Sequence, residues 1–290
     1  MEQAINVQSL AQKRRTYFKH PGSLIVFLLT WLAALLTMGV LVFLIGYILI
    51  KGVPFLTPDL FKLEYNSDNV SMLPALINTL LMTVLALLIA GPLGIFAAIY
   101  MVEYAKKGNK VVGVVRVTAE TLSGIPSIVY GLFGALFFVT FLHLRLSLIS
   151  GALTVAIMVL PTILRTTEEA LIAVPASFRE GSFGLGAGKL RTVFRIVLPS
   201  AVPGILSGVI LATGRIVGET AALIYTSGTV ANLAGFFDSG RTLAIHMYSL
   251  SREGMHTNEA YATAVVLLVV VLIINGVSSL IAKKFEAPKQ

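Results

Sequence analysis

The chain of 290 residues contains no cysteine, and only 12 % of its residues are charged. The lack of cysteine excludes a thiol nucleophile, a thiolate metal site and any disulfide framework. Soluble globular domains carry roughly a quarter of their residues as charged side chains. This chain carries about half that share, while 56 % of its residues are hydrophobic. It is therefore not an ordinary soluble enzyme, and its surroundings must be largely lipid.

Long apolar runs are what the sequence has in abundance. A helix needs about 20 predominantly apolar residues to cross the hydrocarbon core of a bilayer. Lipid offers the backbone no hydrogen-bond partners, so continuous runs of this length are expected to be helical. The sequence therefore predicts an all-α membrane protein with six transmembrane helices, at 23–50, 73–101, 111–142, 148–164, 199–226 and 260–282.

The domain organisation follows from these runs. The apolar run of the first segment is too long for a cleavable signal peptide, and no small-residue cleavage site ends it. We expect a tail at 1–22, a first transmembrane helix with its outer loop at 23–72, a transmembrane domain at 73–285 and a tail at 286–290.

Basic residues gather in alternate loops. On the side of the N-terminus, Lys and Arg are about three times as frequent as on the other side. The positive-inside rule then predicts a multi-pass protein of the inner membrane with both termini in the cytoplasm. The net charge of +8 is explained by this topology, and no nucleic acid is expected as a partner.

The cytoplasmic segment 174–199 is the longest and most highly charged loop on its side. It reads as two short helices joined by a glycine-rich break, with Pro175 ending the preceding helix and Pro199 opening the next. A solvated loop has no need of its apolar residues, such as Phe183 and Leu185. Either the segment packs beneath its own bundle, or it forms a docking surface for a cytoplasmic partner.

The run GLGAGKL within this segment is not a nucleotide-binding loop. A Walker A loop needs a glycine five residues before its Gly-Lys pair and a Ser or Thr after it. Phe183 and Leu190 occupy those positions. We therefore expect no ATP site and no cofactor in this chain, and another subunit would supply any energy.

Glu180-Gly-Ser, followed by Gly186 and then by Ile196-x-Leu-Pro199, resembles the EAA loop of ABC importer permeases. Gly181 and Ser182 replace the two usual alanines, and both are small. The resemblance implies a type I ABC importer permease fold whose cytoplasmic coupling helix inserts into a cleft of a separate ATPase subunit. The residues that it assigns to this coupling are Glu180, Phe183, Gly186 and Lys189.

Two Arg–Glu pairs fall inside predicted spans, Arg116 with Glu120 and Arg215 with Glu219. Ionisable groups are costly in a bilayer, so each is a functional candidate. The spacing of four residues allows each pair to bond within its helix. Arg116 lies near the cytoplasmic end and could reach water, whereas Arg215 would lie about 20 Å from either end of its helix. A purely structural staple between helices stays open.

The fifth span has one face of small residues. At 100° per residue, Gly204, Gly208 and Ala212 share a sector with Arg215 and Glu219. Small residues let helices approach closely in membranes. We therefore expect Gly204, Gly208 and Ala212 to serve helix packing beside the charged pair.

The sign of the embedded charge favours an anion. Arg116, Arg165 and Arg215 outnumber Glu120 and Glu219. The planar fork of arginine suits phosphate oxyanions in particular.

Three runs, ExxSGIPSIVYG at 120–131, LPxxxRTTEEA at 160–170 and GRxxGET at 214–220, resemble the permeases of phosphate-specific ABC transporters. The C-terminal stretch 242–275, which includes AYATA at 260–264, resembles the A-type subunit of these transporters more than the C-type. The resemblance implies import of inorganic phosphate, with Arg116, Glu120, Arg165, Arg215, Glu219 and Thr220 along the substrate pathway. It also implies a heterodimer with a C-type phosphate permease subunit, two copies of an ABC ATPase that bind ATP and Mg, and an external phosphate-binding protein.

Other functions remain as alternatives. A permease for another oxyanion, such as phosphonate, sulfate or molybdate, belongs to the same broad class. An intramembrane protease is disfavoured because no HExxH run occurs and the four histidines fall in the tail or outer loops. A passive channel would not need the coupling segment.

Overall fold

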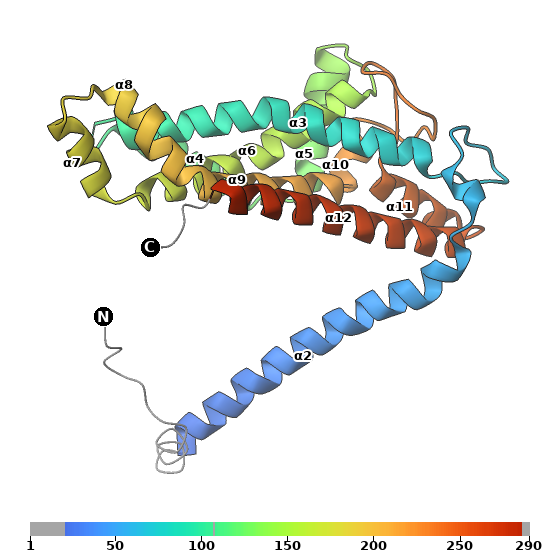
Figure 1. Ribbon diagram of the computed structural model, residues 1–290. Helices are drawn as coiled ribbons and strands as arrows, with labels where there is room; N and C mark the ends of the chain where they lie inside the picture. The colour runs from blue at the N-terminus through green and yellow to red at the C-terminus, as the bar shows by residue number, and fades with distance from the viewer. Residues whose placement is uncertain (1–20, 107, 286–290) are drawn as a thin grey trace. The chain divides into compact units, whose positions relative to one another are not determined.

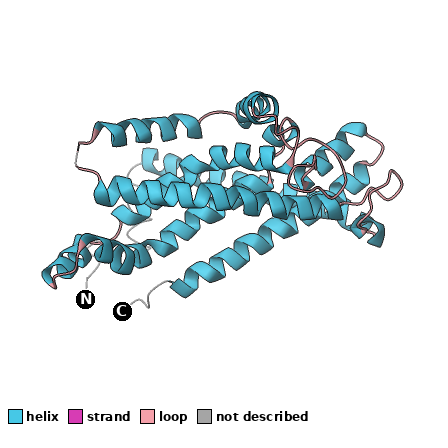
Figure 2. Ribbon diagram, turned by 90° about the horizontal axis from the view of Figure 1, so that it is seen from above, coloured by secondary structure: helices cyan, strands magenta, loops and turns pink. Residues whose placement is uncertain are grey.

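The computed structural model describes residues 21–106 and 108–285, and every regular element among them is helical (Figure 2). The expected all-α fold is therefore confirmed. The chain divides into two compact units, 1–51 and 52–290. The described part of the first unit belongs to α2 (Pro21–Gly52), whose side chains are almost all exposed. The predicted tails, 1–22 and 286–290, fall almost wholly outside the described residues.

The second unit is a bundle of long helices with short helices at both ends (Figure 1). In chain order its elements are η1 (Val53–Phe55), η2 (Pro58–Phe61), α3 (Leu73–Ile99), η3 (Tyr100–Tyr104), α4 (Lys110–Ser123), α5 (Ser127–Gly134), η4 (Ala135–Phe141), α6 (Leu148–Ile172), α7 (Ala176–Gly184), α8 (Lys189–Thr192), η5 (Val193–Val197), α9 (Leu198–Val217), α10 (Ala221–Ile224), α11 (Leu243–Glu253) and α12 (Thr257–Phe285). The elements η3, η4 and η5 are π-helical turns.

Helix α6 is the centre of this bundle and packs against both α3 and α9. Small residues let the backbones approach closely, and Ala86 and Ala90 of α3 share a buried cluster with Ala152 and Ala156 of α6. A Cβ on Gly94 of α3 would lie 2.9 Å from the Ile163 side chain. The helix runs on to Ile172, beyond the predicted end of the fourth span at 164, because its last turns also pack inside the bundle.

The third predicted span is bent rather than straight. Helices α4 and α5–η4 meet at 104° across a break at residues 124–126. Pro126 has no N–H and cannot continue the helical ladder, which explains the break. The Tyr130 hydroxyl donates across it to the Leu122 carbonyl at 2.7 Å. The described residues therefore hold five single helices long and apolar enough to cross a membrane, or six if the bent pair counts as one span.

The fifth predicted span ends early. Helix α9 stops at Val217, and α10 begins only at Ala221. The expectation of one helix over 199–226 is therefore wrong, and so is the position of Arg215 midway along it. Gly218 is the residue directly after α9. Glycine destabilises the interior of a helix because its backbone loses much entropy there, and at the helix end this cost is avoided.

The coupling-like segment lies at one end of the bundle, where α7 and α8 project, and α11 lies at the other end (Figure 1). Helix α8 continues through η5 into α9 as one helical run, Lys189–Val217. Pro199 lies in the first turn of α9, as predicted, where a missing N–H is tolerated, although the π-turn η5 joins this helix to α8.

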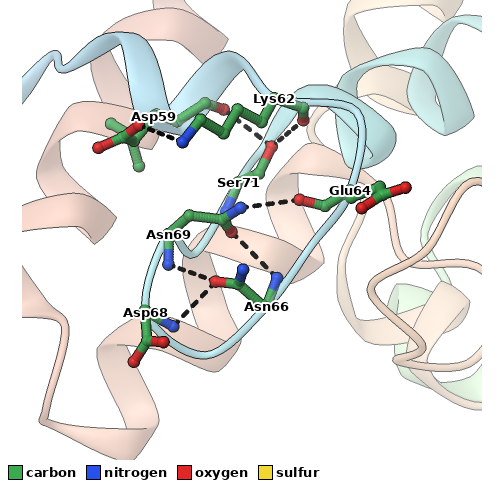
Figure 3. A network of polar contacts seen from close by, with 8 residues as sticks. Asp59, Lys62, Glu64, Asn66, Asp68, Asn69 and Ser71 are labelled. Carbon is green, nitrogen blue, oxygen red and sulfur yellow. Dashed lines mark hydrogen bonds and ion pairs between the residues drawn. The ribbon is translucent and has the colours of Figure 1, made fainter.

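The outer segment before α3 belongs to the second unit, which begins at Gly52. Its turn is held by polar side chains (Figure 3): the Asn66 Oδ1 accepts from the amides of Asp68 and Asn69, and the Asn69 Oδ1 accepts from those of Asn66 and Ser71. Beneath it, Leu60 and Met72 pack with residues of α11 and α12.

Candidate functional site

A partly buried ion pair joins α4 to α6. The Arg116 Nε donates to the Glu168 Oε1 at 2.6 Å, and the Arg116 Nη2 lies 2.5 Å from the same oxygen. The Glu168 side chain is only 7 % exposed, and that of Arg116 is 47 % exposed. The predicted pair of Arg116 with Glu120 is therefore not formed, since the enclosed carboxylate attracts the guanidinium more strongly than an exposed one does. Sequence reasoning missed Glu168, although it stands in the same TTEEA run as Arg165.

A second, looser set of charges lies between the same helices. The Arg165 Nη1 lies 3.9 Å from the Glu120 Oε2, and its Nε lies 3.7 Å from the Glu169 Oε1. All three side chains are exposed on the surface of the chain, so these contacts are weak. The structure thus brings Arg116, Glu120 and Arg165 to one α4–α6 face. In one pair the arginine, Arg116, is on α4, and in the other the arginine, Arg165, is on α6.

Arg215 and Glu219 do not pair with each other. Because α9 ends between them, Glu219 turns to the start of α10, where its Oε1 accepts from the Ala222 amide at 3.0 Å. Arg215 forms no ion pair with any residue that the structure describes, and it is only partly buried. Thr220, in the break between α9 and α10, makes only a long hydroxyl contact of 3.5 Å with the Gly218 carbonyl.

The small residues of α9 face α6 closely. A Cβ on Gly204 would lie 2.6 Å from the Ala170 Cβ, and one on Gly208 would clash with the Thr166 hydroxyl. Ala212 is fully buried in the core. These three positions bring α9 against α6 within reach of the charged α4–α6 face.

The coupling segment has exposed side chains on α7 and a contact with the bundle at Lys189. Glu180 and Phe183 lie on the exposed surface of α7, and Leu185 is 92 % exposed. Gly186 takes a left-handed φ of 79° in the turn after α7, a conformation that favours glycine. The Lys189 Nζ lies 5.0 Å above the Tyr104 ring of the same chain, so this residue contacts the bundle rather than standing free.

Two coupling-segment contacts were missed from the sequence. Arg179 of α7 donates to the Glu103 Oε1 of η3 at 3.1 and 2.6 Å, and to the carbonyls of Leu171 and Val174. Ser182 shares a buried hydrogen bond of 2.9 Å with Thr192 of α8. The only available signal was that Glu103 is a lone acid at the end of a long apolar run.

The outer end holds an enclosed basic pair. His246 lies in α11, within the segment that connects the last two candidate spans as predicted, and it is fully buried. Burial, together with the nearby charge of Arg241, lowers the pKa of His246 to about 3, so its ring is neutral at physiological pH. The Arg241 guanidinium lies 4.6 Å above the Tyr65 ring. No group of His, Asp and Glu in the described residues could hold a metal ion.

Comparison with known proteins places the chain in a class. The family model of the binding-protein-dependent transport system inner membrane component matches residues 90–287. The chain therefore belongs to this family, the permeases of ABC importers. It is a multi-pass protein of the inner membrane, and its family supplies the transmembrane subunit.

Two relatives are similar over most of the chain. A probable ABC transporter permease protein, YqgI of Bacillus subtilis, is 34 % identical over 279 residues, covering 88 % of this chain and 95 % of that protein. The phosphate transport system permease protein PstA 1 of Mycobacterium tuberculosis (strain CDC 1551 / Oshkosh) is 35 % identical over 211 residues, covering 71 % of this chain and 69 % of that protein.

Solved structures share the fold. A permease chain of a bacterial ABC transporter that imports the acidic polysaccharide alginate aligns with a TM-score of 0.61 at 17 % identity, covering 95 % of this chain and 100 % of that one. The MetNI methionine ABC transporter in an inward-facing conformation aligns with a TM-score of 0.58 at 19 % identity, covering 74 % and 94 %. The predicted type I importer permease fold is confirmed.

Proposed function

We propose that this permease carries inorganic phosphate, as one half of the pathway of an ATP-driven importer. Several relatives are named as phosphate transport permeases, among them the PstA 1 protein of Mycobacterium tuberculosis. The observation that carries the proposal is the state of Arg215. It is a cation at the end of a spanning helix that no carboxylate of the described chain neutralises.

The distribution of charge around Arg215 supports an anion as the solute. Arg116 is matched by Glu168, and Arg165 lies near two carboxylates. Among the three arginines assigned to the pathway, Arg215 is therefore the one whose guanidinium is available to a passing oxyanion, which can accept two hydrogen bonds from this planar fork. Glu219 does not pair with Arg215, because its Oε1 accepts from the Ala222 amide at the start of α10. Arg116 is paired with Glu168, and its place along the pathway stays part of the proposal.

The exposed charges on the α4–α6 face imply a covering partner. Glu120, Arg165 and Glu169 are too polar to face acyl chains. A second permease across a wet path would cover them, and a C-type phosphate permease subunit in a heterodimer fits this place. Two copies of an ABC ATPase would bind ATP and Mg, and an external phosphate-binding protein would deliver the solute. The chain itself would need no cofactor.

Transport would proceed by alternating access. Nucleotide-driven movement of the ATPases would reach the bundle through α7 and α8, whose exposed apolar side chains suit a protein partner. The bundles would then rock so that the path opens to one side at a time, with Arg215 and Thr220 along it.

Both termini would lie in the cytoplasm, on the side of α7. Because the chain has no cysteine, single cysteines at the exposed positions Ser177 and Ser67 can be labelled with a membrane-impermeant maleimide. Labelling of Ser177→Cys from the periplasmic side of intact cells would contradict this orientation.

Phosphate uptake by the reconstituted importer tests the role of Arg215. Arg215→Gln should lower ATP-driven uptake by about 100-fold, because removing a guanidinium that pairs with an enclosed anion costs several kcal/mol. Assembly with the ATPase should be unchanged. Arg252→Gln, which removes an exposed arginine from the last turn of α11, is the matched control and should transport normally.

The same assay separates phosphate from other oxyanions. Unlabelled phosphate should compete with radiolabelled phosphate, whereas sulfate, molybdate and phosphonates should not compete at equal concentration. Normal uptake by Arg215→Gln would overturn the assignment of the pathway. Stronger competition by another oxyanion would overturn phosphate as the solute.

A further inference from the structure

The inward-facing side chains of the coupling helix α7 are polar. Of its residues from Ala176 to Gly184, only Arg179 and Ser182 are turned inward, while the others are exposed. These two positions lie three residues apart and therefore on one face of the helix. An amphipathic helix is normally held by an apolar stripe. Here one arginine and one serine take its place.

Arg179 makes four hydrogen bonds to two different helices. Its Nε and Nη2 donate to the Glu103 Oε1 at 3.1 and 2.6 Å, which reaches η3 at the end of α3. Its Nη1 donates to the Val174 carbonyl at 2.8 Å and its Nη2 to the Leu171 carbonyl at 2.9 Å. These carbonyls lie at the C-terminal end of α6, where backbone acceptors lack helical partners and a cation is favoured.

This contact is shielded from water. The Glu103 side chain is 8 % exposed and that of Arg179 is 21 % exposed. A charge-assisted contact in such surroundings is stronger and more rigid than an ion pair on the surface. We call the set formed by Arg179, Glu103 and the carbonyls of Leu171 and Val174 the latch.

A second contact reaches η3 as well. The Lys189 Nζ at the start of α8 lies over the ring of Tyr104, the neighbour of Glu103. The buried hydrogen bond between Ser182 and Thr192 ties α7 to α8. Both short helices therefore reach η3, and they are joined to each other. Both η3 and η5, which leads from α8 into α9, are π-turns, a feature often found at functional sites.

We propose that the latch is the mechanical link through which movement of α7 is delivered to α3 and α6. Arg179 is then a positioning residue: it touches neither solute nor nucleotide, and it makes the end of α3 move with the coupling helix. The proposal rests on the function proposed above, because it takes the movement of α7 to originate in an ATPase subunit. It adds that this movement enters the bundle at Glu103 as well as along the covalent path into α9.

The test compares transport with ATP hydrolysis in proteoliposomes that contain the complete importer. Arg179→Gln should keep copurification with the ATPase and should keep basal ATP hydrolysis. The amount of phosphate imported per ATP hydrolysed should fall by about tenfold, a typical size for coupling between distant sites. Arg179→Lys should give a ratio of phosphate to ATP between those of the wild type and Arg179→Gln. One ammonium group cannot reach the carboxylate and both carbonyls together. Glu103→Arg combined with Arg179→Glu should recover part of the ratio, and Arg252→Gln serves as the control.

A distance measurement provides a readout independent of activity. Spin labels on Ser177→Cys in α7 and Tyr100→Cys in η3, both exposed positions, can be introduced because the chain has no cysteine. With the latch intact, the distance between them should stay narrow and unchanged when ATP is added. In Arg179→Gln the distribution should broaden and shift with nucleotide.

Two results would overturn the proposal. One is a wild-type ratio of phosphate to ATP in Arg179→Gln together with an unchanged distance. The other is loss of ATPase binding in Arg179→Gln, because Arg179 would then belong to the docking surface. Failure of the proposed function would look different, since the unsubstituted complex itself would show no ATP-driven phosphate uptake.

Discussion

At the scale of single residues, the ionisable groups of the spanning helices differ in how well each is enclosed. Glu168 is nearly buried while its partner Arg116 is half exposed, and Glu120, Arg165 and Glu169 are all exposed. The cost of losing a partner depends on the group that remains, because an enclosed charge without a partner is far more costly than a solvated one.

The Arg116–Glu168 pair should therefore respond asymmetrically to substitution. Arg116→Gln leaves a buried carboxylate alone and should lower the free energy of unfolding by about 2–3 kcal/mol. Glu168→Gln leaves a half-exposed guanidinium and should cost about 1 kcal/mol or less. Thermal unfolding of the purified complex, followed by the loss of a folded peak on size exclusion, provides the measurement.

Arg165→Gln is the matched control, because its contacts are long and exposed, and it should change stability by less than about 0.5 kcal/mol. Equal losses of stability in Arg116→Gln and Glu168→Gln would contradict this prediction. They would show that the exposure of the remaining partner does not determine the cost of breaking the pair.

The sequence allowed the candidate charges to be chosen but not their partners. Arg116, Arg165 and Arg215 stand out because a charge is rare in an apolar run. Spacing within one helix predicted the wrong pairs, since Arg116 meets Glu168 fifty-two residues away. A contact between helices depends on their relative rotation, which one sequence does not specify.

At the scale of elements, close packing of α9 on α6 depends on glycine. Gly208→Ala would place a Cβ against the Thr166 side chain, and overpacking of this kind costs about 1–3 kcal/mol. Gly214→Ala on the same helix meets nothing within 4 Å and should be neutral or stabilising by about 0.5–1 kcal/mol. The same thermal assay compares the two variants.

The opposite ranking, with Gly214→Ala the more damaging, would show that the α6–α9 contact is not where the helices approach most closely. The periodicity of small residues on α9 is sufficient to predict from the sequence that Gly204 and Gly208 serve helix packing. Their neighbours on α6, Ala170 and Thr166, were not identified, because one sequence does not specify the relative rotation of two helices.

The helix breaks were only partly predictable. The break at 124–126 follows from Pro126, whose missing N–H interrupts the ladder. The end of α9 at Val217 has no such local cause, because glycine is tolerated in transmembrane helices. Helix α10, which follows the break, packs closely against α5, where a Cβ on Gly131 would lie 2.7 Å from the Ala222 Cα.

At the scale of the whole molecule, hydropathy and length are enough to predict most of the fold. Six apolar runs in 290 residues limit the fold to a helical bundle in a bilayer, and the structure and the family agree. Two features lie beyond this reasoning: the inclusion of residues 52–72 in the second unit, and the attachment of α7 by Arg179. Both depend on contacts between segments far apart in the chain.

We expect this chain to conduct phosphate while a separate polypeptide hydrolyses ATP. The most direct measurement is phosphate uptake into proteoliposomes that hold the permease pair, with the ATPase and the binding protein either present or withheld. The account predicts uptake only when ATPase, binding protein and ATP are all present. Uptake by vesicles that contain this chain without an ATPase or nucleotide would contradict it.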